Sequence, residues 1–220
     1  MFIDKEHVAK EFLGRNFQKE MDKVLMNLEK EGRVPKLLLH SCCAPCSSYC
    51  IEYLSNYFEI TVFYYNPNIS EEPEYRRRVE EQKKFIRNFP AKYPVSFLEG
   101  DYDAQKYFAR VKGLEKCQEG GERCFVCYEM RLDEAARKAK ELQMDYFCTT
   151  LTISPLKNSP KLNEIGCRLA KEYGVAYLVS DFKKREGYKR SIELSREYNL
   201  YRQNYCGCIF SKMESEQINS

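Results

Sequence analysis

The segment of residues 37–50 constrains the fold of this chain most. Its leucine run at 37–39 has the length of a strand and leads directly to the adjacent cysteines Cys42 and Cys43. Pro45 then suits the first turn of a helix. The segment therefore predicts a strand and a helix that deliver two thiols to the carboxyl end of the strand. Ligands bind at that edge of open α/β sheets, and the start of a helix favours thiolate over thiol.

The rest of the chain continues the alternation of strands and helices. Strands are expected at residues 36–41, 60–65, 95–98, 145–150 and 175–180. Helices are expected at about 8–30, 45–57, 71–88, 103–111, 122–142 and 159–173. Such an alternation predicts a doubly wound, mostly parallel, five-stranded α/β sheet with right-handed crossovers, similar to nucleotide-binding domains.

A chain of 220 residues is long enough to bury one core of this kind, so we expect a single α/β domain. Residues 1–35 would supply an N-terminal helix that packs on the sheet. Residues 36–180 would form the sheet and its crossover helices. The remainder, 181–220, is polar, basic and rich in tyrosine, and we expect it to cap the strand ends.

Overall composition limits the compartment and the partners. The 36 basic and 33 acidic residues are too balanced to indicate a nucleic-acid partner, so any basic surface must be local. No apolar run of about 18 residues and no apolar segment of a signal peptide is present, which predicts a cytoplasmic protein with no membrane partner. Eleven cysteines in a reducing compartment indicate metal ligands or redox thiols rather than a disulfide framework.

Two cysteine pairs could share a metal. Cys124 and Cys127 form a C-x-x-C motif at the start of an expected helix. Together with Cys42 and Cys43 they offer four thiolates, enough for a tetrahedral zinc or a four-iron cluster. Adjacent cysteines are unusual in structural zinc sites, whose ligands are typically spaced C-x₂₋₄-C, so the pattern favours a cluster. The alternative is that these cysteines are small buried hydrophobic residues.

A third pair, Cys206 and Cys208, is separated by a single glycine. Two such thiols can close a small strained ring, and strained disulfides have the oxidising potentials of labile or catalytic pairs. The pair is thus either a two-electron reservoir or a ligand pair for a second metal, and the sequence leaves both open. Cys46 lies near enough to Cys42 to be a further ligand, whereas Cys50 is one turn deeper and expected in the core.

A local basic cluster could hold RNA. It comprises Lys183, Lys184, Arg185, Lys189, Arg190 and Arg202, and tyrosines lie between and after these residues. Cations take phosphates and aromatic rings stack on bases, a combination that suits an extruded or single-stranded nucleotide. The alternative is a solvated face with half-buried tyrosines. By contrast, residues 76–78, three arginines among glutamates, are expected on an exposed, salt-bridged helix face.

No glycine-rich phosphate loop follows the first strand, so use of ATP is not supported. His40 lies inside that strand, where a structural imidazole with satisfied hydrogen bonds is the expected role.

Six blocks of sequence, in order, resemble the QueH family of epoxyqueuosine reductases. They are His-Ser-Cys-Cys-Ala-Pro-Cys at 40–46, Tyr-Asn-Pro-Asn-Ile at 65–69, Cys-Phe-Val-Cys-Tyr-Glu-Met-Arg-Leu at 124–132, Thr-Thr-Leu-Thr-Ile-Ser-Pro at 149–155, Asp-Phe-Lys-Lys at 181–184 and Tyr-Arg-Gln-Asn-Tyr-Cys-Gly-Cys at 201–208. The resemblance runs from about residue 36 to 211 and leaves the N-terminal helix unmatched.

This resemblance implies a cobalamin-independent enzyme that reduces the epoxide of epoxyqueuosine in the anticodon loop of tRNA, and that needs an electron donor. It implies a [4Fe-4S] cluster on Cys42, Cys43, Cys124 and Cys127, with room for a further iron ion beside it. It also implies a redox role for the pair at 206 and 208. The fold would be similar to the nucleotide-binding domains of tRNA-thiolating enzymes, with cysteines in place of the phosphate loop.

Reduction of an epoxide to an alkene consumes two electrons and two protons, and the C–O bond breaks more easily when its oxygen is coordinated or protonated. We expect an iron ion supported by Cys46 to coordinate the epoxide oxygen and Tyr205 to protonate it. Two alternatives remain at this stage. One is an iron–sulfur-dependent tRNA thiolation enzyme on the same scaffold, which the missing phosphate loop disfavours, and the other is a zinc-stabilised RNA-binding module without catalysis.

Overall fold

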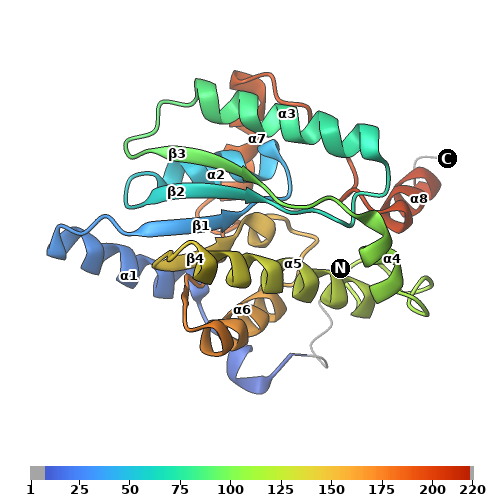
Figure 1. The fold of residues 1–220 in the computed structure, drawn as a ribbon, viewed down its shortest axis with the longest axis horizontal. Coiled ribbons are helices and arrows are strands. Elements are labelled where there is room, and N and C mark those ends of the chain that lie inside the picture. Colours follow the sequence, from blue (N-terminus) through green and yellow to red (C-terminus); the bar gives the residue numbers. More distant parts are fainter. Residues whose placement is uncertain (1–7, 219–220) are drawn as a thin grey trace.

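The computed structural model describes residues 8–218 (Figure 1). The expectation about a signal peptide concerns residues 1–7, which lie outside this range. The strands are β1 (Lys36–His40), β2 (Glu59–Tyr64), β3 (Val95–Glu99), β4 (Tyr146–Thr149) and β5 (Ala176–Tyr177). The α-helices are α1 (Phe17–Glu31), α2 (Ala44–Leu54), α3 (Glu72–Asn88), α4 (Ala104–Arg110), α5 (Glu122–Glu141), α6 (Ser159–Tyr173), α7 (Gly187–Glu197) and α8 (Ile209–Ile218), and the 3₁₀ helices are η1 (Lys10–Phe12) and η2 (Thr150–Ile153).

The five strands form one parallel sheet in the order β3-β2-β1-β4-β5. In the central strand, Leu38 pairs in register with Thr61 of β2 and with Phe147 of β4. The chain winds outward from β1 to β3, then returns to the other side of β1 and continues to β5. The predicted doubly wound sheet is confirmed, and its topological switch point lies between β1 and β4.

Strand β1 is buried on both faces, as its continuous apolar sequence requires. Leu37 and Leu39 pack into a core with α1, α2 and α3, whereas Leu38 points to the opposite face and packs with α5 and α6. Each of these leucines is fully buried and contributes about 1.5–3 kcal/mol to folding. Figure 1 shows the sheet between α2 and α3 on one side and α5 and α6 on the other, with the strand ends pointing towards α4 and α8.

The N-terminal helix begins later than the sequence predicts. It starts at Phe17, where the Asn16 side chain accepts a hydrogen bond from the backbone N–H of Lys19. Before it, η1 makes one short turn, and Gly14 has a φ of +76°. That left-handed residue interrupts a helix that hydrophobic spacing alone extends back to residue 8.

Strand β5 is shorter than the expected 175–180, since only Ala176 and Tyr177 pair with β4. The reason is a side chain on α6. Asn163 accepts a hydrogen bond from the backbone N–H of Ser180 and donates one to its carbonyl oxygen, both over 2.9 Å. This amide replaces the ladder hydrogen bonds that a longer strand would make.

The C-terminal cap contains two helices that the sequence analysis left unspecified. Helix α7 packs on α2, where the Arg190 guanidinium pairs with the Glu52 carboxylate at 2.7 Å. Helix α8 lies beside α4 at the carboxyl end of the sheet (Figure 1). Among residues 8–218, no helix combines the length and the apolar character needed to cross a bilayer.

Candidate active site

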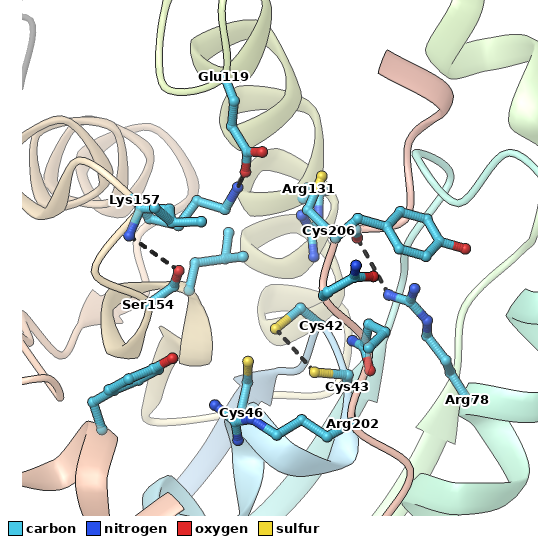
Figure 2. A pocket seen from close by; sticks show the side chains of 16 residues that line it. Cys42, Cys43, Cys46, Arg78, Glu119, Arg131, Ser154, Lys157, Arg202 and Cys206 are labelled. Atoms are coloured by element: carbon cyan, nitrogen blue, oxygen red, sulfur yellow. Dashed lines mark hydrogen bonds and ion pairs between the residues drawn. The ribbon is translucent and has the colours of Figure 1, made fainter. Parts of the chain in front are cut away.

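A cavity of about 410 Å³ opens at the carboxyl ends of β1 and β4, at the switch point of the sheet. Four cysteines line it: Cys42, Cys43, Cys46 and Cys206. Charged side chains form much of the remaining wall, namely Arg78, Glu119, Arg131, Lys157 and Arg202. Figure 2 shows the first three cysteines together on one side and Cys206 on the segment that closes another.

Cys42, Cys43 and Cys46 form a compact triad. The Cys42 and Cys43 sulfurs are 3.9 Å apart, and all three sulfurs lie within 4.8 Å of one another. Within residues 8–218 this is the one group of three or more histidine, cysteine or acidic side chains close enough to share a single metal ion. The prediction that Cys46 lies beside the strand-end pair is confirmed, and Cys50 is fully buried in the core, as expected.

Hydrogen bonds from three neighbouring elements fix the turn that carries the triad. Gln82 of α3 accepts from the hydroxyls of Ser41 and Ser47 over 2.7 and 2.8 Å. The Asn66 amide, after β2, donates to the Ser41 carbonyl oxygen, and Thr150 of η2 accepts from the backbone N–H of Cys42. Both sides of the switch point therefore hold the cysteine turn.

The triad holds its negative charge on one sulfur. Hydrogen bonds from Cys43 and Cys46, together with the nearby Arg131 charge, hold the pKa of the Cys42 thiol well below its usual range despite burial. The same coupling raises the pKa of Cys43 to about 12 and raises the pKa of Cys46. One thiolate with two thiol donors is a donor set for a thiophilic metal.

Cys124 and Cys127 lie in the first two turns of α5 and are almost completely buried. Burial raises the pKa of the Cys124 thiol to about 11. Their sulfurs lie outside the 4.8 Å group and do not line the cavity. Arg131 relates the Cys124–Cys127 pair to the triad, because its Nη1 is 3.9 Å from the Cys127 sulfur and its charge acts on Cys42.

Cys206 and Cys208 are free thiols with their sulfurs 3.5 Å apart. The Cys206 carbonyl oxygen accepts hydrogen bonds from Arg78 and Asn68, which tie the segment to α3 and to the turn after β2. A hydrogen bond from Cys208 and the Lys157 charge outweigh burial and lower the pKa of Cys206 to about 5. The pair therefore contains one thiolate and one thiol within reach of each other.

Three buried cations line the cavity, and two of them have carboxylate partners. Arg78 pairs with Glu74, and Lys157 with Glu119, both at 2.7 Å. Arg131 forms no ion pair with a carboxylate of residues 8–218. The sequence analysis did not single out Lys157 or Glu119.

The expectation of an exposed arginine run at 76–78 is wrong for its last member. Arg76 and Arg77 are exposed, but Arg78 is only 2% exposed and lines the cavity. Helical spacing explains the difference, because Arg78 shares its face with the buried Tyr75, Val79 and Gln82. This helical spacing is the feature of the sequence that could have predicted the burial of Arg78.

The basic cluster proposed for RNA divides into two groups. Arg190 is balanced by three glutamates, Lys183 pairs with Asp181, and Arg185 pairs with Asp22. Lys184 and Lys189 are exposed on the surface, and Lys189 pairs with Glu186 at 3.3 Å. Arg202 lines the cavity, where its guanidinium lies 5.4 Å from the centre of the Tyr188 ring.

Three further side chains complete the description of the site. Tyr205 lines the cavity with the Arg78 guanidinium 5.2 Å from its ring centre. Tyr107 of α4, which sequence reasoning missed, is buried with Cys127 and Cys208, and burial and these thiols raise the pKa of its phenol. His40 is a structural imidazole as predicted, with nitrogens 2.9 Å from the Thr149 hydroxyl and 3.1 Å from the Tyr65 carbonyl oxygen.

This fold and site define an α/β protein of the nucleotide-binding type in which cysteines occupy the turn after the first strand. The chain belongs to a family with this pattern: residues 37–214 match the family model "Epoxyqueuosine reductase QueH". Membership makes the chain an oxidoreductase that acts on tRNA, and it favours the reductase prediction over the thiolation enzyme and the RNA-binding module.

Curated relatives agree over most of the chain. An epoxyqueuosine reductase QueH from Streptococcus pyogenes serotype M1 is 48% identical over 198 residues, covering 89% of this chain and 78% of the relative. One from Staphylococcus epidermidis is 44% identical over 212 residues, covering 93% and 89%. One from Thermotoga maritima is 34% identical over 187 residues, covering 82% and 92%.

Among solved structures, the chain is similar to the U34-tRNA thiolase NcsA from Methanococcus maripaludis with its [4Fe-4S] cluster. The TM-score is 0.52 at 12% sequence identity, and the match covers 92% of this chain and 72% of that one. At this identity the likeness concerns the fold. It confirms the expected similarity to the scaffold of tRNA-thiolating enzymes.

Proposed function

We propose that the protein is cytoplasmic and that its cysteine-lined cavity reduces the epoxide of epoxyqueuosine, in the anticodon loop of tRNA, to the alkene of queuosine. The balance is one epoxide, two electrons and two protons to one alkene and one water. The observation that carries the proposal is the meeting of the Cys42–Cys43–Cys46 triad and Cys206 in one cavity of about 410 Å³. Reducing thiols and metal-binding thiols thus face the same space.

For the cofactor, we propose a [4Fe-4S] cluster held by Cys42, Cys43, Cys124 and Cys127. Sulfurs on one tetrahedral zinc lie about 3.8 Å apart, since a Zn–S bond is about 2.3 Å. The α5 pair lies outside the group of sulfurs that could share one ion, which suits a cluster, because each of its ligands binds a different iron. When bound, the cluster supplies electrons one at a time.

A further iron ion is proposed next to Cys46. The triad sulfurs lie within 4.8 Å of one another, so Cys46 is well placed to support an ion adjacent to the cluster ligands Cys42 and Cys43. The chemistry of the donor set supports this, because thiolates are soft ligands that prefer iron or zinc over hard cations.

Cys206 and Cys208 are proposed as a two-electron store that the electron donor refills through the cluster. Two thiols that close to a disulfide release two electrons and two protons, and a reductant then restores them. The 3.5 Å separation of the sulfurs and the lowered pKa of Cys206 favour this closure. Ligation of a second metal by the same pair is the competing outcome.

The chain's own polar groups would assist the bond cleavage. Tyr205 is proposed to donate a proton to the departing oxygen from the cavity wall. Lys157 keeps a positive charge beside Cys206, because the charges of Cys206 and Glu119 outweigh burial and raise its pKa. Arg78 orients the Cys206 backbone from the other side.

The rim of the cavity is proposed to bind the RNA. Arg202 and Tyr188 would hold the modified nucleotide at the entrance by cation and ring contacts. The exposed Lys184 would contact phosphates, and the exposed Arg185 and Lys189 would do so in competition with their partners Asp22 and Glu186. Lys183 and Arg190 belong to the same segment, where their acidic partners reduce the charge available for RNA.

Anaerobic purification with iron and sulfide quantitation tests the cofactor, and turnover with epoxyqueuosine-containing tRNA tests the reaction. Nucleoside mass analysis should show loss of one oxygen atom with the wild type and with C167S, whose partly exposed cysteine lies outside the cavity. C206S should lose turnover while retaining iron. Full turnover by C206S with intact iron would remove the dithiol from the mechanism, and metal-free active protein would reject the cluster.

A further inference from the structure

Arg131 is a buried cation without a carboxylate partner. It is 3% exposed, and no aspartate or glutamate of residues 8–218 forms an ion pair with it. Its three hydrogen-bonding neighbours are neutral or sulfur groups: Asn66, His40 and Cys127. A buried charge that lacks compensation is expensive, so another anion must balance it.

The groups that can carry this anion are thiols. Arg131 Nη1 lies 3.9 Å from the Cys127 sulfur, and Arg131 lines the same cavity as Cys42 and Cys206. These thiols come from three separate parts of the chain. Figure 2 shows Arg131 between Cys42 and Cys206 in the cavity.

Local structure explains why the guanidinium points there. Cys124, Cys127 and Arg131 are spaced at i, i+3 and i+7 along α5, so they share one face of the helix. Asn66 accepts a hydrogen bond from Arg131 Nη2 at 2.5 Å and donates another to the Ser41 carbonyl oxygen, which orients the guanidinium towards the cysteine turn.

His40 cannot supply the missing negative charge, because an imidazole is either neutral or cationic. Its ring is fully buried, with nitrogens 2.9 Å from the Thr149 hydroxyl and 3.1 Å from the Tyr65 carbonyl oxygen. The other two buried cations of the cavity already have Glu74 and Glu119. Arg131 is thus the buried cation of the cavity that no carboxylate of residues 8–218 neutralises, so its charge is available to stabilise negative charge on the sulfurs.

We propose that Arg131 is the fixed counter-ion of the thiolate-bound cofactor and sets its reduction potential. The inference rests on the proposed cluster. A cluster on four thiolates is anionic and becomes more so on reduction, and net charge and hydrogen bonds to sulfur are among the factors that set iron–sulfur potentials. A positive charge at this position stabilises the reduced form and raises the potential. Arg131 is a positioning residue in this sense and touches no substrate.

The test is an anaerobic redox titration of the purified holoenzyme, followed by electron paramagnetic resonance. R131Q removes the charge and should lower the equilibrium constant for reduction of the cluster at least tenfold. For a one-electron couple this corresponds to a downward shift of the reduction potential of about 59 mV. R131K keeps the charge and should stay within tenfold of the wild type. R137Q is the matched control, since Arg137 lies on the same helix, is exposed and pairs with Glu134 and Glu141; its potential should equal that of the wild type.

Each outcome is informative. An R131Q potential equal to that of the wild type, with iron and sulfide retained, overturns the inference. If R131Q is isolated without iron, R131K decides: retained cluster and potential support a role for charge, whereas loss of the cluster in R131K as well overturns it. Wild-type protein without iron and sulfide would instead reject the proposed cofactor, a failure distinct from that of the Arg131 assignment.

Discussion

Arg78 donates a hydrogen bond from Nη1 to the carbonyl oxygen of Cys206 over 3.3 Å, across 128 positions of sequence. The same guanidinium pairs through Nε with Glu74 on its own helix. The Cys206–Cys208 segment of the C-terminal cap is therefore attached to α3 by a hydrogen bond from a buried, ion-paired arginine. Asn68 donates to the same carbonyl oxygen, and the Ser70 backbone N–H donates to the Gly207 carbonyl oxygen, so several contacts hold the segment.

Replacing Arg78 should weaken this attachment. We expect R78M to lower the free energy of unfolding by about 3 kcal/mol, because Glu74, only 11% exposed, then loses its ion-pair partner and keeps only the Tyr201 hydroxyl. Turnover should fall as well, since Cys206 loses a backbone anchor. Urea denaturation measures the first effect. R76M is the control, because Arg76 is exposed and should change stability by less than about 1 kcal/mol; equal effects of the two variants would contradict the prediction.

Gly207 should tolerate no side chain. Its φ is +112°, and a Cβ atom would lie 2.8 Å from Ile69 Cγ1 and 3.2 Å from Arg78 Nη1. G207A should therefore cost about 1–3 kcal/mol in stability and displace the two thiols. Thermal unfolding and the rate of thiol alkylation measure this. Gly113 is the control, since it has a φ of +87° with nothing within 4 Å, so G113A should leave the alkylation rate unchanged.

The substitutions C46S and C124S should lower the iron and sulfide content of the protein to different extents. If Cys124 is a ligand of the cluster, C124S should lose most of its iron and sulfide. C46S should retain sulfide and lose at most the further iron ion, because Cys46 lies with Cys42 and Cys43 in the triad. Iron and acid-labile sulfide per chain are the measurement. The opposite order would assign the cluster to the triad and release Cys124 from it.

Arg202 and Arg190 should make different contributions to tRNA affinity. R202A should weaken binding several-fold and reduce the salt dependence by about one counter-ion, because Arg202 is exposed at the cavity. R190A should lower stability and change affinity less than twofold, because Glu52, Glu193 and Glu197 already balance its charge. Fluorescence anisotropy at several salt concentrations compares them. A larger loss in R190A would contradict this division.

His40 should make the fold sensitive to acid. Burial, with the Arg131 charge, lowers the pKa of His40 to about 3, against 6.5 when the chain is unfolded. The unfolded chain thus binds a proton that the folded chain excludes, so this contribution is present above pH 6.5 and is lost as the pH falls towards 3. We expect the stability advantage of the wild type over H40Q to shrink by about 1.4 kcal/mol per pH unit below pH 6. Denaturant unfolding of both proteins at pH 7, 6 and 5 measures it, and a constant difference would contradict the assignment.

Local patterns determined the scaffold. The leucine run at 37–39 followed by Cys42 and Cys43 predicted a central strand with thiols at its carboxyl end, and the structure has both. Element boundaries were predicted less well where a single contact decides them. Gly14 interrupts the N-terminal helix, and Asn163 ends β5, and neither effect follows from hydrophobic periodicity.

The sequence by itself determined the parallel sheet, the cysteine turn after β1 and the cysteine motifs, because period, turn chemistry and spacing are local properties. Only the tertiary structure decided which charges surround the sulfurs. Arg78, Arg131 and Lys157 are buried together although 53 and 26 positions separate them along the chain. The physical reason is that a buried charge is neutralised by groups far apart in the sequence, which the winding of the sheet brings together. No local sequence pattern predicts which groups these are.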